Sequence, residues 1–195
     1  MIPYREPTRQ ELTVLRRSFS YWGIFDYVHD KAILVREIKS KDSIIKEVYL
    51  ATIECFKMIS EHMPVSHTGL LVGHLRRRSF VPSMAGADLI ARVGSDYPFV
   101  LVNQTAEALV LYGRDIMYGS IIDYGNLDNK NKNKNKNKNN KNNNIIIIVL
   151  NKNRVAIGLG ITTVSFGNKT IPPISDKKIA IKTLADAGHY LRNEG

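Results

Sequence analysis

The first clear pattern of apolar and polar positions lies near the N-terminus. Four apolar residues follow one another at helical spacing, namely Leu12, Leu15, Phe19 and Trp22. Thr8 precedes them and Glu11 stands three residues later, which is the spacing of a capping box, and Gly23 provides a stop. The pattern predicts an amphipathic helix that buries this apolar stripe. Its opposite face would expose Arg9, Arg16 and Arg17.

Further short segments follow up to residue 98. We predict strands over Ala32–Ile38, Lys46–Ala51 and Leu70–Leu75, a helix over Thr52–Glu61 that Pro64 closes, and a short helix that opens at Pro82 and Ser83 and reaches Ala91. Gly94, Asp96 and Pro98 then indicate a domain boundary.

The second half is dominated by short β-like segments separated by turn residues. The predicted strands are Phe99–Val102, Ala108–Tyr112, Ile145–Leu150, Arg154–Thr162 and Lys178–Ile181, and Ile121-Ile122 is also strand-like. Asn151–Asn153 is expected to form a tight turn, and Leu184–Leu191 a terminal helical turn. Several short strands at such spacing favour a small barrel or sandwich.

These elements predict an α+β protein of two domains. Residues 1–93 would form an α/β domain with an antiparallel sheet that offers a docking surface, and residues 94–195 a β-rich domain. Within the second domain, residues 126–144 are expected to be a disordered insertion. Its center is the tract 129–144, which contains six lysines, ten asparagines and nothing else, and therefore cannot bury enough apolar surface to become ordered.

Composition changes this picture in one respect. The chain has 28 Lys and Arg against 18 Asp and Glu, a net charge of +10. Six of these positive charges lie in the tract, so the rest of the chain carries only +4. The tract lacks the aromatic residues and arginines that contact bases, so we interpret it as a loop insertion; the alternative is a nucleic-acid-binding segment.

The chain has no pattern of a secreted or membrane protein. Charged residues interrupt the first thirty positions, and the longest apolar run, Ile145–Leu150, is far shorter than the roughly 20 residues that span a bilayer. Cys55 is the single cysteine and cannot form an internal disulfide. We expect a soluble protein of the cytoplasm, or of the nucleus or nucleolus in a eukaryote, without a membrane partner.

Candidate catalytic and metal-binding motifs are also missing. The five histidines do not form a His-Glu-X-X-His pattern, and Gly158-Leu159-Gly160 lacks the third glycine of a dinucleotide loop. Gly158 and Gly160 are better explained by crowding in a bent barrel strand. We therefore expect no enzyme activity, no metal, no cofactor and no small-molecule substrate.

Gly113-Arg114-Asp115 resembles the Gly-Arg-Leu-Asp motif of pseudouridine synthases, in which the aspartate is the nucleophile. The leucine is missing here, and the surrounding segment is too short for that catalytic domain. We favour a structural role for Arg114 and Asp115 at a junction between a strand and a loop.

Three segments of the second half resemble successive strands of a PUA domain, an RNA-binding module. They are Tyr97–Asn103, Ala108–Asp115 and Arg154–Gly160. The closing segments Ser175–Lys178 and Asp186–Arg192, together with Leu71–Arg76, resemble the Nip-seven family of ribosome-biogenesis proteins of archaea and eukaryotes.

This resemblance implies a C-terminal PUA-type mixed β pseudo-barrel after an N-terminal α/β domain. It also implies a non-catalytic RNA-binding protein that acts in assembly of the large ribosomal subunit or in processing of ribosomal RNA. Its partners would be RNA, most naturally ribosomal, and other assembly or RNA-processing proteins. The alternative is an RNA-modification enzyme or its PUA-containing targeting subunit.

The family's RNA-contacting face implies roles for basic residues near the C-terminus, namely Lys177, Lys178 and Lys182, with Lys169 and Arg192 as substitutes for a basic position that is Ala185 here. The charge pattern is compatible, since clustered lysines contact phosphates. A strand edge protected by exposed lysines would look the same in sequence. A possible second basic surface is Arg76, Arg77 and Arg78, of which at most two can share one face if all three lie in a strand.

Overall fold

The structure is a computed structural model, and it describes residues 4–39, 44–62, 68–76, 78–127, 145–164, 166 and 177–189. The chain divides into two compact units, Met1–Asp96 and Tyr97–Gly195. This boundary lies three residues after the expected one, because the backbone amide of Ser95 donates a hydrogen bond to the carbonyl of Gly23 at 3.1 Å and so ties residues 94–96 to the first unit.

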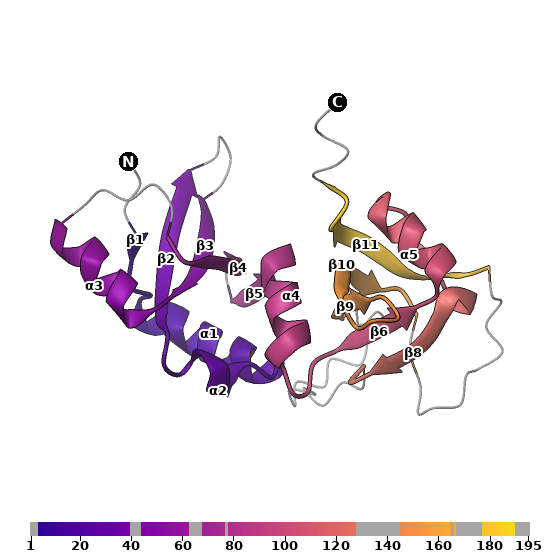
Figure 1. Cartoon of the computed structure of the whole chain (residues 1–195), viewed down its shortest axis with the longest axis horizontal. Coiled ribbons are helices and arrows are strands. Elements are labelled where there is room, and N and C mark those ends of the chain that lie inside the picture. The colour runs from indigo at the N-terminus through magenta and orange to yellow at the C-terminus, as the bar shows by residue number, and fades with distance from the viewer. Residues whose placement is uncertain are drawn as a thin grey trace. The chain divides into compact units, whose positions relative to one another are not determined.

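The first unit contains a sheet of five antiparallel strands in the order β1-β2-β3-β4-β5 (Figure 1). The strands are β1 (Tyr4–Arg5), β2 (Ala32–Lys39), β3 (Ile44–Ala51), β4 (Leu70–Arg76) and β5 (Ser79–Pro82). The helices are α1 (Arg9–Tyr21), α2 (Phe25–Val28), α3 (Ile53–His62) and α4 (Met84–Val93). The antiparallel sheet that we expected is confirmed, and Pro64 lies outside the described residues.

Helix α1 forms as its sequence predicts. The Thr8 hydroxyl accepts a hydrogen bond from the Glu11 amide, and the Glu11 carboxylate accepts one from the Thr8 amide, which completes the capping box. The helix ends at Tyr21, and Gly23 follows the C-cap residue Trp22 with a φ of 66°, which glycine adopts at little cost. On its apolar face, the ring of Phe19 packs edge-on against Phe80 of β5.

The two faces of the first sheet follow the alternation of residues along β2 and β3. Leu34 and Tyr49 pair across these strands and belong to an apolar cluster to which α3 contributes Phe56. Val35 and Val48 form the next pair and therefore point to the opposite face, where both are fully buried. The sheet is thus covered on both faces.

The second unit contains a mixed sheet of six strands in the order β7-β11-β10-β9-β6-β8, which curls into a half-barrel (Figure 1). The strands are β6 (Phe99–Val102), β7 (Ile116–Met117), β8 (Ile121–Gly125), β9 (Ile146–Leu150), β10 (Ala156–Thr162) and β11 (Ile179–Asp186). Helix α5 (Gln104–Leu111) and the 3₁₀ turn η1 (Tyr118–Ser120) connect them. Among the described strands of this sheet, β6 and β9 are the one pair that runs parallel. The predicted α+β fold class is confirmed.

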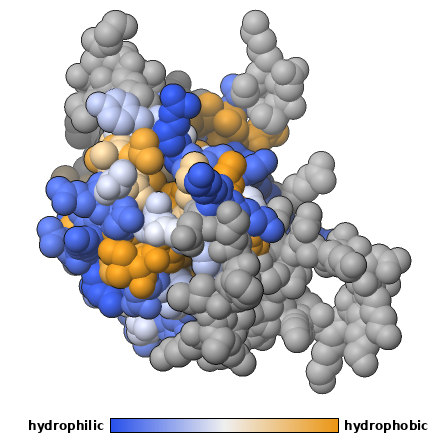
Figure 2. Space-filling view, turned by 90° about the vertical axis from the view of Figure 1, so that its right-hand side faces the viewer, coloured by the Kyte–Doolittle hydropathy of each residue, from blue (hydrophilic) through white to orange (hydrophobic). Residues whose placement is uncertain are grey.

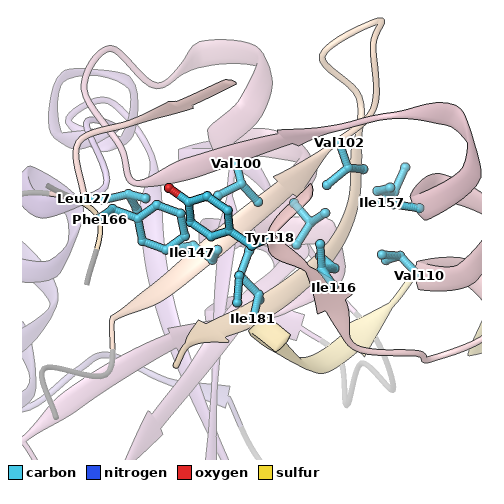
Figure 3. Close-up of a cluster of buried hydrophobic side chains, with 13 residues drawn as sticks. Val100, Val102, Val110, Ile116, Tyr118, Leu127, Ile147, Ile157, Phe166 and Ile181 are labelled. Carbon is cyan, nitrogen blue, oxygen red and sulfur yellow. The ribbon is translucent and has the colours of Figure 1, made fainter. Parts of the chain in front are cut away.

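Inside the curled sheet lies a core of branched aliphatic side chains closed by two aromatic rings (Figure 3). Tyr118 and Phe166 stack with their ring centroids 6.0 Å apart. Gly158 and Gly160 of β10 permit close packing here, because a Cβ at Gly158 would come within 3.0 Å of Val110 and one at Gly160 would collide with Ile181. The prediction that these glycines relieve crowding in a bent strand is confirmed, and the β10–β11 register shifts at Gly160.

Three predictions for the second unit were wrong. Residues 108–111 belong to α5 instead of a strand, because Asn103 caps a helix whose buried face is Ala106 and Val110; a short apolar run does not distinguish the two structures. Leu184 belongs to β11 instead of a helical turn, because the long partner strand β10 pairs with β11 as far as Asp186.

The third error concerns the start of the insertion at residue 126. Asn126 donates a hydrogen bond to the Tyr97 carbonyl at 3.3 Å, and Leu127 is buried in the core. Both residues therefore belong to the fold, and residues 128–144 lie outside the described part of the chain. The predicted turn at Asn151 is confirmed, since its side chain accepts hydrogen bonds from the amides of Asn153 and Val155.

Candidate nucleic-acid interface

Lys177 and Lys178 lie in the turn that leads into β11, and both side chains are exposed. The core holds the backbone of this turn in place. The amide of Tyr118, whose ring lies in the core, donates a hydrogen bond to the Lys178 carbonyl at 2.9 Å. Thr163 donates from its amide to Ala180 and from its hydroxyl to Ile179. The two lysines therefore project from an anchored backbone.

Lys182 lies further along β11 and is also exposed. Its backbone pairs with Ile161 of β10. Lys182 is four positions after Lys178, which corresponds to about 13 Å of extended chain. The next residue, Thr183, is held from the other side, because its amide donates to the Asp115 carboxylate at 3.0 Å and its hydroxyl donates to the Arg114 carbonyl at 2.8 Å.

The loop between α5 and β7 adds two residues that sequence reasoning missed. Gly113 has a φ of 72° and turns the chain so that Arg114 follows α5 directly beside β11. The Arg114 side chain is exposed, and so is the Tyr112 ring, at 70%. A structural role was predicted for Arg114 and Asp115 together. The Asp115 carboxylate and the Arg114 carbonyl do fasten the loop to Thr183, although the Arg114 side chain is exposed and the segment follows a helix instead of a strand. The sequence did contain one signal for this loop. Gly113 directly follows an apolar run, and a glycine at such a place is typical of a helix end.

We call Lys177, Lys178, Lys182 and Arg114 the β11 basic strip. Within the described part of the chain, no carboxylate forms an ion pair with any of the four. The nearest carboxylate in sequence to Lys182 is Asp186, which is 5% exposed. Cations that form no described ion pair, on one strand, the turn before it and the loop that packs against it, attract phosphates.

Exposed apolar residues accompany the charges. Ile179 and Met117 pair across β11 and β7 and are 41% and 48% exposed, and Leu184 is 52% exposed. Viewed from the side of α5 and β8, the second unit has apolar patches directly beside hydrophilic ones (Figure 2). Such a mixture suits a ligand with both charged and planar apolar groups, as RNA has.

The structure does not gather all of the predicted site residues. Lys169, Arg192 and Arg77 lie outside the described residues. Arg76 ends β4 and pairs with Ser79 of β5, so Arg78 lies in the turn of a hairpin. The assumption that the three arginines continue one strand was therefore wrong. They belong to the first unit, whereas the β11 basic strip belongs to the second.

Within the described ranges, no group of three or more His, Cys, Asp or Glu side chains could hold a metal ion. Cys55 is exposed. Burial lowers the pKa of His74, which pairs with Glu47 across β4 and β3. Among the described residues, no helix is long and apolar enough to cross a membrane.

Comparison with known proteins agrees with this architecture. The family model of the UPF0113 PUA domain matches residues 99–195. A curated UPF0113 protein of Archaeoglobus fulgidus is 36% identical over 118 residues, which cover 60% of this chain and 63% of that protein. The match thus spans less than two thirds of that relative.

Three solved structures share the fold over nearly the whole chain. A conserved PUA domain protein from Thermoplasma acidophilum has a TM-score of 0.62 at 15% identity and covers 96% of both chains. A PUA domain from Aeropyrum pernix K1, crystallised as a tartrate complex, has a TM-score of 0.57 at 12% identity and covers 98% of this chain and 89% of its own. A hypothetical protein from Pyrococcus horikoshii OT3 has a TM-score of 0.60 at 11% identity, with 94% of both chains covered.

The predicted C-terminal PUA domain is confirmed, although residues 108–111 form part of a helix, and a PUA domain points to RNA as the ligand. The β11 basic strip lies inside the matched region, as do the exposed loop residues beside it. Residues 99–195 therefore form a C-terminal PUA domain that matches the family model of the UPF0113 PUA domain.

Proposed function

We propose that this protein binds RNA through the β11 basic strip and acts, without catalysing a reaction, as an assembly or RNA-processing factor for the large ribosomal subunit. The observation that carries the proposal is the strip itself: four exposed cations on a PUA domain that have no described carboxylate partner. Point charges on a fixed backbone contact phosphates and position an RNA without reading its sequence.

The ribosomal part of the proposal rests on the resemblance of Ser175–Lys178 and Asp186–Arg192 to the Nip-seven family. Under this proposal the first unit docks other assembly proteins, and the protein works in the cytoplasm or, in a eukaryote, in the nucleolus. The non-catalytic role is supported by Asp115, whose carboxylate is occupied by the Thr183 amide and so serves the structure.

Tyr112 extends the proposed interface. Its ring is 70% exposed and stands two residues before Arg114, at the end of α5. An exposed aromatic ring beside a cation is the arrangement on which an unpaired RNA base stacks, with a contribution of about 1–3 kcal/mol per base. The strip would hold the backbone, and Tyr112 would hold one base.

The test is a filter-binding titration of a labelled RNA stem-loop with a single-stranded tail, over a series of KCl concentrations. Lys177→Ala with Lys178→Ala should weaken binding and lower the salt slope by about two, since each lysine releases about one counterion. The matched control is Lys130→Ala with Lys132→Ala in the Asn/Lys tract, which has the same net charge and should lose less affinity at moderate salt.

Equal losses in the two double variants would remove the strip from the site, because they would show that only net charge matters. Incubation of the pure protein with ribosomal or transfer RNA, followed by nucleoside analysis, tests the non-catalytic role. A modified nucleoside would replace it with the alternative, an RNA-modification enzyme. Crosslinking in cells, followed by sequencing of the attached RNA, tests the ribosomal assignment.

A further inference from the structure

One end of the first unit's sheet carries three exposed basic residues from different segments. Strand β2 ends at Lys39, which pairs with Ile44 at the start of β3. Strand β4 runs toward the same end, since Leu75 pairs with Lys46 and Arg76 follows it. Arg78 lies in the turn from β4 to β5. We call Lys39, Arg76 and Arg78 the sheet-end basic surface.

Further into the sheet, charged residues neutralise one another. Arg5 forms ion pairs with Glu11 at 2.7 Å and Glu37 at 2.6 Å. Lys46 contacts the same two carboxylates at 2.8 and 3.4 Å. Two cations and two carboxylates thus form a closed network that leaves no net charge.

On the opposite face of the sheet, positive and negative charges also neutralise each other. Arg36 pairs with Glu47 at 2.8 Å, and both side chains are less than a fifth exposed. The carboxylates that β2 and β3 contribute to the described structure, Glu37 and Glu47, therefore already form ion pairs. Lys39, Arg76 and Arg78 have no described ion-pair partner, so the unneutralised charge of the sheet is positive and concentrated at one end.

The backbone presents these charges at a defined spacing. The Ser79 hydroxyl donates a hydrogen bond to the Arg76 carbonyl at 3.0 Å, and Arg76 and Ser79 also pair where β4 meets β5. Lys39 and Arg76 stand on strands separated by β3, so their backbones are about 10 Å apart. Guanidinium groups donate two parallel hydrogen bonds to a phosphate, which gives arginine an advantage over lysine at such a site.

We propose that the sheet-end basic surface is a second RNA-phosphate site, in the unit that does not contain the PUA domain. The inference rests on the proposed RNA-binding function and adds a second contact region to it. RNA is favoured over an acidic protein because the bound polyanion would already be held by the β11 basic strip of the same chain, which raises its effective concentration at the second surface.

The experiment compares four full-length proteins in the same titration of a labelled RNA stem-loop: wild type, Arg76→Ala with Arg78→Ala, Lys177→Ala with Lys178→Ala, and the combination of all four changes. Arg16→Ala with Arg17→Ala is the matched control, because these arginines are exposed on α1 of the same unit and their removal changes the charge equally. Circular dichroism verifies that each variant is folded.

If the proposal is right, Arg76→Ala with Arg78→Ala lowers the salt slope by about two, the combined variant lowers it by about four, and the α1 control leaves it nearly unchanged. If only the Lys177 and Lys178 changes weaken binding, the second site is refuted and the PUA interface stands. That result would leave the arginines, next to exposed Ile44 and Ile45, as a surface for a protein partner. If neither double substitution changes the RNA affinity or the salt slope, the proposed function itself fails.

Discussion

The carboxylate of Asp115 accepts a hydrogen bond from the backbone amide of Thr183 at 3.0 Å, and this contact fastens the loop after α5 to strand β11. The two residues are 68 positions apart in sequence. The Thr183 hydroxyl also donates a hydrogen bond to the Arg114 carbonyl, so Arg114 is held next to the residue that follows Lys182 in β11.

Replacing Asp115 with alanine should lower both stability and RNA affinity. The Thr183 amide would lose its acceptor, which costs about 1–2 kcal/mol of unfolding free energy for a partly buried group. Asp115→Asn retains a side-chain oxygen and should recover most of the loss. Urea denaturation and the RNA titration measure the two effects. Equal stability of Asp115→Ala and wild type would mean that the loop is held by other contacts.

The ion-pair network of the first sheet predicts a loss of stability in acid. The hydrogen bond from the Arg5 guanidinium, helped by Lys46 and the Thr8 amide, holds the pKa of Glu11 well below its ordinary value of 4.5. A carboxyl whose pKa is lower in the folded state contributes stability above its unfolded pKa. That contribution is lost as the pH falls below about 5.

Glu11→Gln isolates this charge effect, because glutamine still caps the helix. We expect the variant to be about 2 kcal/mol less stable at neutral pH and to lose less stability on acidification than wild type does. Urea denaturation of the two proteins at neutral and acidic pH measures this. The control is Glu6→Gln, which removes an exposed carboxylate that has no described ion pair. Parallel pH profiles for Glu11→Gln and wild type would contradict the assignment.

Gly86→Ala should destabilise the first unit even though alanine is the better helix former. Gly86 lies in the first turn of α4, where a Cβ would collide with the Val72 carbonyl of β4. The helix propensity gain is at most about 1 kcal/mol, whereas forcing an atom into a packed contact costs about 1–3 kcal/mol. We expect a net loss of up to about 2 kcal/mol in urea denaturation.

The control for this prediction is Gly94→Ala at the end of the same helix, where φ is −72° and alanine fits without strain. A Gly86→Ala variant as stable as this control would show that α4 can shift away from β4.

Residues that act locally were predictable. Thr8 and Glu11 cap α1, Ser83 caps α4 through its hydroxyl, and Asn151 forms its turn, because each of these contacts joins residues at most four positions apart. Strands β2, β3 and β4 of the first sheet were also predictable from their apolar residues, whereas the short strands β1 and β5 were not predicted. Residues 108–111 were not, because a run of apolar residues fits a buried strand and a buried helix equally well.

The sequence by itself determined the two-domain α+β organisation, the PUA resemblance of the second half and three cations of the strip, Lys177, Lys178 and Lys182. Only the tertiary structure decided that Arg114 joins the strip, that Arg76 ends a strand while Arg78 lies in the hairpin turn, and which described cations form no ion pair with a carboxylate. The physical reason is the separation in sequence over which each interaction acts. Capping, turns and periodicity act between neighbours in sequence, whereas charge neutralisation and the Asp115–Thr183 contact depend on strand register, which joins residues far apart in the chain.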